Sequence, residues 1–143
     1  MQELTINGQV FQFHYGVGFL KEINKKTVIP VEGFPGEKKN VGLRYTIMKL
    51  YDGDVETLLD VLDIANKKKT PRVTKEQLES YIDDENTDID ELFEETLGFL
   101  QKTNATKKET LDVLESIQKA IEEQKRKEQE KKEQEKKEQK DRN

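Results

Sequence analysis

Hydrophobic and polar residues alternate with a period of two over residues 1–15, on both sides of Asn7-Gly8. Asn-Gly is the preferred two-residue type I′ turn of a β-hairpin, because both positions require positive φ. A turn there pairs Leu4 with Phe11 and gathers the apolar side chains on one face. Those side chains are Leu4, Ile6, Phe11, Phe13 and Tyr15. We therefore expect an N-terminal hairpin whose apolar face covers other elements, since a lone hairpin is marginal in water.

Helical spacing follows in three segments, about 17–25, 41–51 and 55–66, where apolar residues recur three or four positions apart. Asp54 is expected to cap the third of these helices. Residues 27–40 hold two prolines and two glycines, which break regular structure. We expect a loop there, with one short extended piece at 28–31.

Three helix-start signals come next. Thr74, Asp88 and Thr106 are each followed three residues later by Gln or Glu, and each precedes a run of apolar residues with helical spacing. The predicted fold class is α+β and mainly α: an N-terminal β-hairpin, then a small helical domain, then a charged C-terminal extension. The folded domain is expected to span residues 1–121.

Composition changes abruptly after Ile121. Residues 122–143 contain no hydrophobic residue, and Lys-Glu-Gln-Glu-Lys occurs at 127–131 and again at 132–136. The repeat offers no apolar a and d positions for a coiled coil. Its residues do favour helix intrinsically. Two conformations therefore remain open for this low-complexity tail, a solvated helix or a disordered chain.

Charge and cysteine content exclude several classes of function. Residues 1–121 carry 16 Lys or Arg against 22 Asp or Glu, so the domain lacks the positive surface that nucleic-acid binding requires. The tail carries 9 against 8, and mixed signs bind anionic lipid weakly. No segment resembles a signal peptide or a membrane span, and there is no Cys for disulfides or thiolate sites. We expect a cytosolic protein with neither nucleic-acid nor membrane partners.

The strongest candidate for metal chemistry lies at 84–95. Oxygen-bearing residues occupy positions 1, 3, 5, 7 and 12 of a calcium-loop template there. The sixth position requires a glycine for the sharp turn, and Ile89 stands there instead. We therefore interpret the segment as an acidic helix boundary, with Asp88 as a helix cap. The residues that match the template are Asp84, Asn86, Asp88, Asp90 and Glu95.

Catalysis has little support. His14 is the only histidine and has no Ser, Cys or His partner at a recognisable spacing. Gly16-Val17-Gly18 lacks the third glycine of a dinucleotide-binding turn. The acidic pairs at 83–84 and 94–95 have no nucleophile or phosphate loop to act with. We therefore assign no catalytic, cofactor-binding or metal-binding residue, and we expect a protein-binding module rather than an enzyme.

The order of these elements resembles the tail assembly chaperones of long-tailed phages and prophages of Gram-positive bacteria. The resemblance covers about residues 1–106 and rests on order and spacing rather than on one motif. It includes the opening hairpin through Gly16, Phe19–Asn24, Gly42-Leu43, Tyr51–Asp54, Thr70-Pro71, Tyr81–Asp84 and Leu92–Glu95.

The resemblance implies partners that composition could not show. Members of this family coat the tape measure protein, keep it soluble, and help recruit the tail tube protein, which then displaces them. They act in the cytoplasm of the host cell and are absent from the mature virion. Many also exist in a longer, frameshifted form. Lysine pairs such as Lys131-Lys132 could be encoded by slippery codons, although ordinary solubilising lysines explain them more simply.

A chaperone for a long helical client needs exposed apolar surface. Many copies are expected to bind along one client, which gives avidity, and we expect the chain to be a homo-oligomer. As partner-binding residues we select one set from the hairpin and one from the last helix. The alternative is that these residues close the domain's own core. The runner-up for function is a non-chaperone structural or adaptor protein, such as a head–tail or tail component. The selected residues are Leu4, Phe11, Phe13, Leu111, Leu114 and Ile117.

Overall fold

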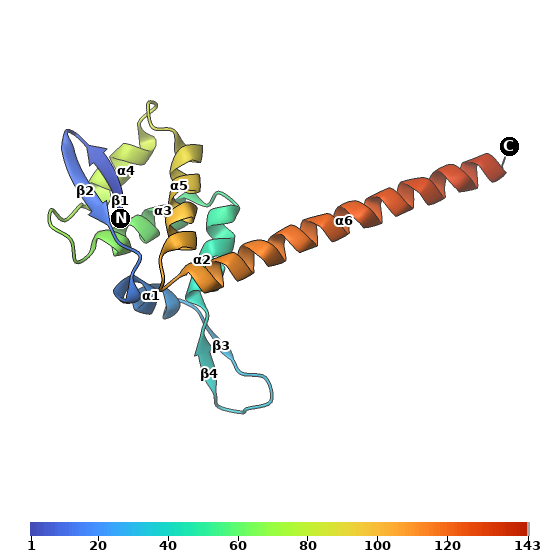
Figure 1. Cartoon of the computed structure of the whole chain (residues 1–143), viewed down its shortest axis with the longest axis horizontal. Coiled ribbons are helices and arrows are strands. Elements are labelled where there is room, and N and C mark those ends of the chain that lie inside the picture. Colours follow the sequence, from blue (N-terminus) through green and yellow to red (C-terminus); the bar gives the residue numbers. More distant parts are fainter. Residues whose placement is uncertain (143) are drawn as a thin grey trace.

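The structure, a computed structural model, describes residues 1–142. Six helices and two small antiparallel hairpins make a mainly helical α+β body from which one long helix projects (Figure 1). In chain order the elements are β1 (Gln2–Ile6), β2 (Gln9–Phe13), α1 (Val17–Asn24), β3 (Val28–Pro30), β4 (Lys38–Asn40), α2 (Gly42–Tyr51), α3 (Val55–Asn66), α4 (Lys75–Asp83), α5 (Ile89–Lys102) and α6 (Lys107–Asp141).

The first hairpin has the predicted turn and register. Leu4 lies opposite Phe11, and both turn residues have positive φ, 52° at Asn7 and 79° at Gly8. The apolar face is buried against the helices, and Gln2 on the same face is buried with it. There Gln2 accepts a hydrogen bond from the Tyr15 hydroxyl and donates one to Thr96 of α5 at 3.2 Å. These contacts attach the start of the chain to a helix more than ninety residues later.

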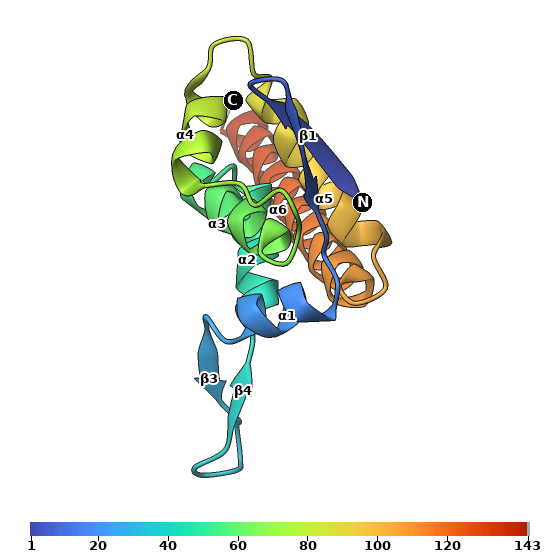
Figure 2. The ribbon, with the colours of Figure 1, turned by 90° about the vertical axis from the view of Figure 1, so that its left-hand side faces the viewer.

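The short extended piece expected at 28–31 is confirmed as β3, but the rest of 27–40 is not only a loop, because residues 38–40 form a second strand and complete a hairpin. β3 pairs with β4, with Ile29 opposite Lys39. The Val31 N–H donates to the Glu37 carbonyl at 3.0 Å, closing a turn that contains two glycines with positive φ. The second strand could not be recognised from the sequence, because β4 is polar and shows no alternation of apolar residues. Pro30, which ends β3, also suggested a break in regular structure. We call residues 27–40 the arm, since they project away from the body (Figure 2).

Helices α1 to α5 and the first third of α6 enclose one hydrophobic core. The helix α2 begins directly against α1: a Cβ on Gly42 would lie 1.8 Å from the Ile23 carbonyl oxygen, so only glycine fits there. The Thr74 capping box and the Asp88 cap are confirmed.

Asp54 and Thr106 stand at the predicted N-cap positions of α3 and α6, but neither side chain accepts a capping hydrogen bond from the helix backbone. The Asp54 carboxylate accepts from the Thr57 hydroxyl at 2.7 Å rather than from a backbone N–H. Thr106 sits at the start of α6, but its buried hydroxyl donates to the Leu100 carbonyl at 2.7 Å. Thr106 therefore ties the α5–α6 turn together instead of capping α6.

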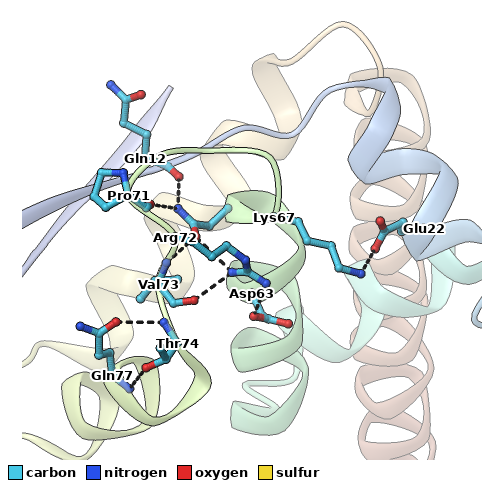
Figure 3. A network of polar contacts seen from close by, with 10 residues as sticks. Gln12, Glu22, Asp63, Lys67, Pro71, Arg72, Val73, Thr74 and Gln77 are labelled. Atoms are coloured by element: carbon cyan, nitrogen blue, oxygen red, sulfur yellow. Dashed lines mark hydrogen bonds and ion pairs between the residues drawn. The ribbon is translucent and has the colours of Figure 1, made fainter.

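The side chain of Asn66, at the end of α3, holds the connection to α4 in place through four partners, Gln12, Pro71, Arg72 and Val73, which are labelled in Figure 3. Its Nδ2 donates to the carbonyls of Gln12 (2.9 Å) and Pro71 (3.2 Å). Its Oδ1 accepts from the Val73 N–H (2.7 Å) and from the Arg72 guanidinium (3.1 Å). One fully buried amide thus joins β2, α3 and the 67–74 connector.

The helix α6 runs unbroken to Asp141, about 50 Å at ~1.5 Å per residue. Its first turns pack on α2 and α5, and residues 122–141, which we call the stalk, are exposed throughout. Of the two conformations left open by the sequence, the structure has the helix. Pairs four residues apart, such as Glu123 with Lys127 at 3.4 Å, lie along it. Each such pair adds a few tenths of a kcal/mol, which helps a helix that buries nothing.

Candidate protein-binding surface

The hairpin residues selected as partner contacts lie in the core. Leu4, Phe11 and Phe13 are at most 5% exposed and belong to the hydrophobic core, where β2 packs on α3. This placement matches the alternative interpretation, in which they close the domain's own core. In this structure they present no surface to a partner.

The residues selected from the last helix lie differently. Leu111 is 50% exposed, and Leu114 and Ile117 are half-buried against the edge of the core. The three recur every three residues, so they form a stripe along one side of α6. Ile121, also half-buried, continues this stripe to the start of the stalk. We call these four residues the α6 stripe.

A second apolar stripe, on α2, was missed by the sequence analysis. Tyr45, Met48 and Tyr51 are 41%, 41% and 46% exposed, although they belong to a helix whose other face is in the core. Their spacing of three places them on one face. The sequence did indicate this second stripe, because α2 has apolar residues on two faces. The residues of the buried face alone were enough to predict the helix, so the other face was not considered. Contiguous exposed apolar surface of this kind is typical of protein-binding sites.

Between these helices and the base of the arm lies an open groove of about 950 Å³. Its apolar lining comes from α1, α2, α6 and the turns that lead into them. Polar side chains form the rim, and β4 contributes Lys39 and Asn40 to it. The apolar residues are Leu20, Val41, Leu43, Ala105 and Leu111.

Arg44 joins α2 to α6 beside this groove. Its guanidinium lies 3.2 Å from Asp112 and 3.3 Å from Glu109. The hydrogen bonds that the guanidinium donates to these carboxylates, first to Asp112 and then to Glu109, raise the pKa of Arg44. The groups are partly exposed, so the pairs orient α6 more than they stabilise the fold.

In the acidic segment 84–95, two of the carboxylates accept hydrogen bonds from nearby backbone N–H groups. Asp84 accepts from the Asn86 N–H at 2.9 Å, and Asp88 accepts from the Glu91 N–H at 3.0 Å. A cavity of about 520 Å³ lies between this segment and the first hairpin. Burial raises the pKa of Tyr81 beside it, and the charges of Glu95 and Glu91 add to the effect. Within residues 1–142, no three His, Asp or Glu side chains are placed to hold a metal ion.

His14 lies on the exposed side of the first hairpin, as predicted, and its backbone N–H donates to the Ala65 carbonyl at 2.9 Å. No helix within residues 1–142 is long and apolar enough to cross a bilayer. The two stripes, the groove and the arm are surfaces of the described residues with exposed apolar side chains, and such surfaces suit contact with another protein.

Comparison with protein families gives a match that covers most of the chain. Residues 3–115 match a family described as phage tail assembly chaperone protein, TAC. The matched range includes the core, the arm and the groove, and it ends within the α6 stripe. Neither the curated proteins nor the solved structures gave a match.

Proposed function

Because the chain belongs to the phage tail assembly chaperone family, we propose that it binds the tape measure protein of its phage and keeps that client soluble. In the same proposal it helps recruit tail tube subunits, which then displace it. It acts in the host cytoplasm, is absent from the mature virion, and catalyses no reaction.

The exposed apolar face of α6 is the observation that carries this proposal. A tape measure protein is long and helical, and an amphipathic helix binds by laying its apolar side chains against a partner's apolar groove or stripe. Leu111, Leu114 and Ile117 offer such a stripe, and the α2 stripe offers another. Both are narrow, which favours moderate affinity for each copy and displacement by tube subunits. Many copies along one client supply the avidity that a single copy lacks.

The charge distribution is compatible with this role. The domain is acidic, which keeps it from binding nucleic acid, and its charges maintain solubility when apolar surface is engaged. The stalk adds a charged helix that buries nothing in the chain itself. A longer frameshifted form would carry different residues after the shift, and mass spectrometry of the protein from infected cells would reveal it.

The test is co-expression with the tape measure protein from the same genome, followed by a solubility assay and a pull-down. We expect the client to be soluble only with this partner and to co-elute with it. Leu111→Asp should reduce co-elution at least tenfold, because it places a charge in the α6 stripe. Val17→Asp is the matched control, since Val17 is at least as exposed as Leu111 (59% against 50%) but lies on α1, where an acid suits the helix N-terminus.

Two results would contradict the proposal. A client that stays insoluble, with nothing co-eluting, would remove the chaperone role. Recovery of the protein in purified particles at stoichiometric amounts would favour the alternative, a structural head–tail or tail component.

A further inference from the structure

The stalk is a helix without tertiary packing. Residues 122–141 are exposed throughout, and none of them is hydrophobic. Within residues 1–142 its ion pairs join stalk residues to each other, Glu123 to Lys127 and Arg126 to Glu130. Figure 1 shows the stalk projecting from the body as a continuation of α6. What it does for the protein therefore has to come from something other than burial.

The repeat in the stalk gives it no binding face. Five residues turn an α-helix by about 500°, so the Lys-Glu-Gln-Glu-Lys copy at 132–136 lies ~140° round the axis from the copy at 127–131. Glutamate, lysine and glutamine are thus spread over every side of the helix. A helix that binds through one face repeats the same kind of residue on that face. This geometry points to the helix itself, rather than to a surface on it, as the useful part of the stalk.

Backbone hydrogen bonds link the stalk to the α6 stripe. In an α-helix each carbonyl accepts from the N–H four residues further along. The carbonyls of residues 118–121 therefore bond to the N–H groups of residues 122–125, the first residues of the stalk. Without the stalk these four carbonyls would form the unsatisfied end of α6, where helices fray. Fraying of one turn would release Ile121 and reach Ile117.

The body holds the start of the stripe more firmly than its end. Val113 is the last fully buried residue of α6, and the stripe residues that follow it are only half-buried. The stalk consists of Glu, Lys, Gln and Arg with one Asp up to residue 142, and the first four are strong helix formers. The packed turns of α6 supply the helix nucleus, so the stalk needs only to propagate a helix that already exists.

We propose that the stalk is a helical extension that keeps the α6 stripe folded, because it moves the fraying end of α6 about 30 Å beyond Ile121. The family match ends at residue 115, before the stalk begins. The effect on the stripe does not require a client. Its consequence for client binding rests on the proposed function.

Amide hydrogen exchange at residues 117–121 tests the extension directly. Three chains are compared: the wild type, a variant with residues 122–143 replaced by a Gly-Ser sequence of the same length, and a variant with repeats of Glu-Ala-Ala-Ala-Lys there, which favour helix. We expect exchange at these amides to be at least tenfold faster in the Gly-Ser variant than in the wild type. The helical replacement should restore the wild-type rate. Amides of α5 should exchange equally in all three chains, which checks that the body is intact.

A distance measurement tests whether the stalk is rigid in solution. The chain has no cysteine, so spin labels can be placed at Ser116→Cys and Gln139→Cys, both exposed positions on α6. A continuous helix places these positions about 35 Å apart, and we expect a narrow distribution near that distance. A disordered stalk would give a broad distribution with a root-mean-square distance of about 24–29 Å.

Co-expression with the tape measure protein tests the consequence for binding. The Gly-Ser variant should reduce co-elution at least threefold, and the helical replacement should restore it. Leu111→Asp should reduce co-elution but leave exchange at residues 117–121 unchanged. Failure of client binding and failure of the helical extension are therefore distinguished, because the exchange experiment needs no client.

Four results would overturn the proposal. Exchange at residues 117–121 could be the same in the wild type and the Gly-Ser variant, or the helical replacement could fail to restore protection. The spin labels could show a broad distribution of the disordered kind. A helical replacement that restores protection but not co-elution would mean that the charges of the stalk contact the client themselves, and that the stalk does not act through the stripe.

Discussion

Replacing Asn66 with alanine removes a fully buried amide that makes four hydrogen bonds. The largest cost in free energy comes from the N–H of Val73, which loses the Oδ1 acceptor. Val73 is 1% exposed, so water does not reach this N–H to replace the acceptor. The Gln12 and Pro71 carbonyls lose a donor but lie in partly buried surroundings. Arg72 keeps its contacts with Asp63 and with the Val73 carbonyl.

These losses set the size of the effect. An orphaned buried N–H costs about 1–3 kcal/mol, and each hydrogen bond lost at a partly solvated carbonyl costs about 0.5–1.5 kcal/mol. Because the carbonyls can partly hydrate, we expect Asn66→Ala to lower the free energy of unfolding by about 2–4 kcal/mol. Asn104→Ala, at an exposed asparagine, should change it by no more than about 0.5 kcal/mol.

Urea unfolding followed by tyrosine fluorescence measures this difference. The chain has four tyrosines and no tryptophan, and Tyr15 is in the core. Far-ultraviolet circular dichroism alone would report the helical signal of the stalk together with that of the body, and the stalk can unfold independently of the body. A loss below about 1 kcal/mol for Asn66→Ala, with an unchanged dependence on urea, would refute the argument that this amide holds the α3–α4 connection together.

Three further predictions concern other parts of the fold. Gly42→Ala should destabilise the protein by more than about 2 kcal/mol in urea unfolding, because its Cβ meets a backbone carbonyl, whereas Gly98→Ala in an open helix interior should stabilise it by about 0.5–1 kcal/mol. Burial raises the pKa of Tyr15, so its contribution to stability is complete below about pH 10, the unfolded value, and falls as the pH rises further. Above that pH the wild type should lose stability up to about 1.4 kcal/mol per pH unit more steeply than Tyr15→Phe. Deleting residues 122–143 should reduce helical circular dichroism but leave the urea midpoint of the body unchanged; a large fall in the midpoint would mean that the stalk supports the core.

Local signals in the sequence predicted much of the architecture. The alternation around Asn7-Gly8 predicted the first hairpin with its register, and the pattern at Thr74 predicted a capping box. Such signals suffice because turn geometry and caps involve residues two to four positions apart. The second strand of the arm was missed because it is polar and is recognisable only by its pairing with β3, whose extended piece the sequence did predict.

The sequence did not distinguish the exposed apolar residues from the buried ones. Leu111 and Phe13 are both apolar residues on amphipathic elements, yet one is half exposed and the other is fully buried. Hydrophobicity alone could not distinguish them, because burial depends on which distant helix packs against each face. The groove has the same origin, since α1, α2 and α6 meet there only in the folded chain.

The sequence by itself determined where helices begin, how the first two strands pair, and that residues 122–143 have nothing to bury. Each of these follows from interactions within a few residues or from composition. Tertiary structure alone decided which apolar faces are covered, that Asn66 joins three segments, and that the arm's base and α6 form a groove. Those features depend on contacts between residues far apart in the chain, whose free energies exist only once the helices are packed.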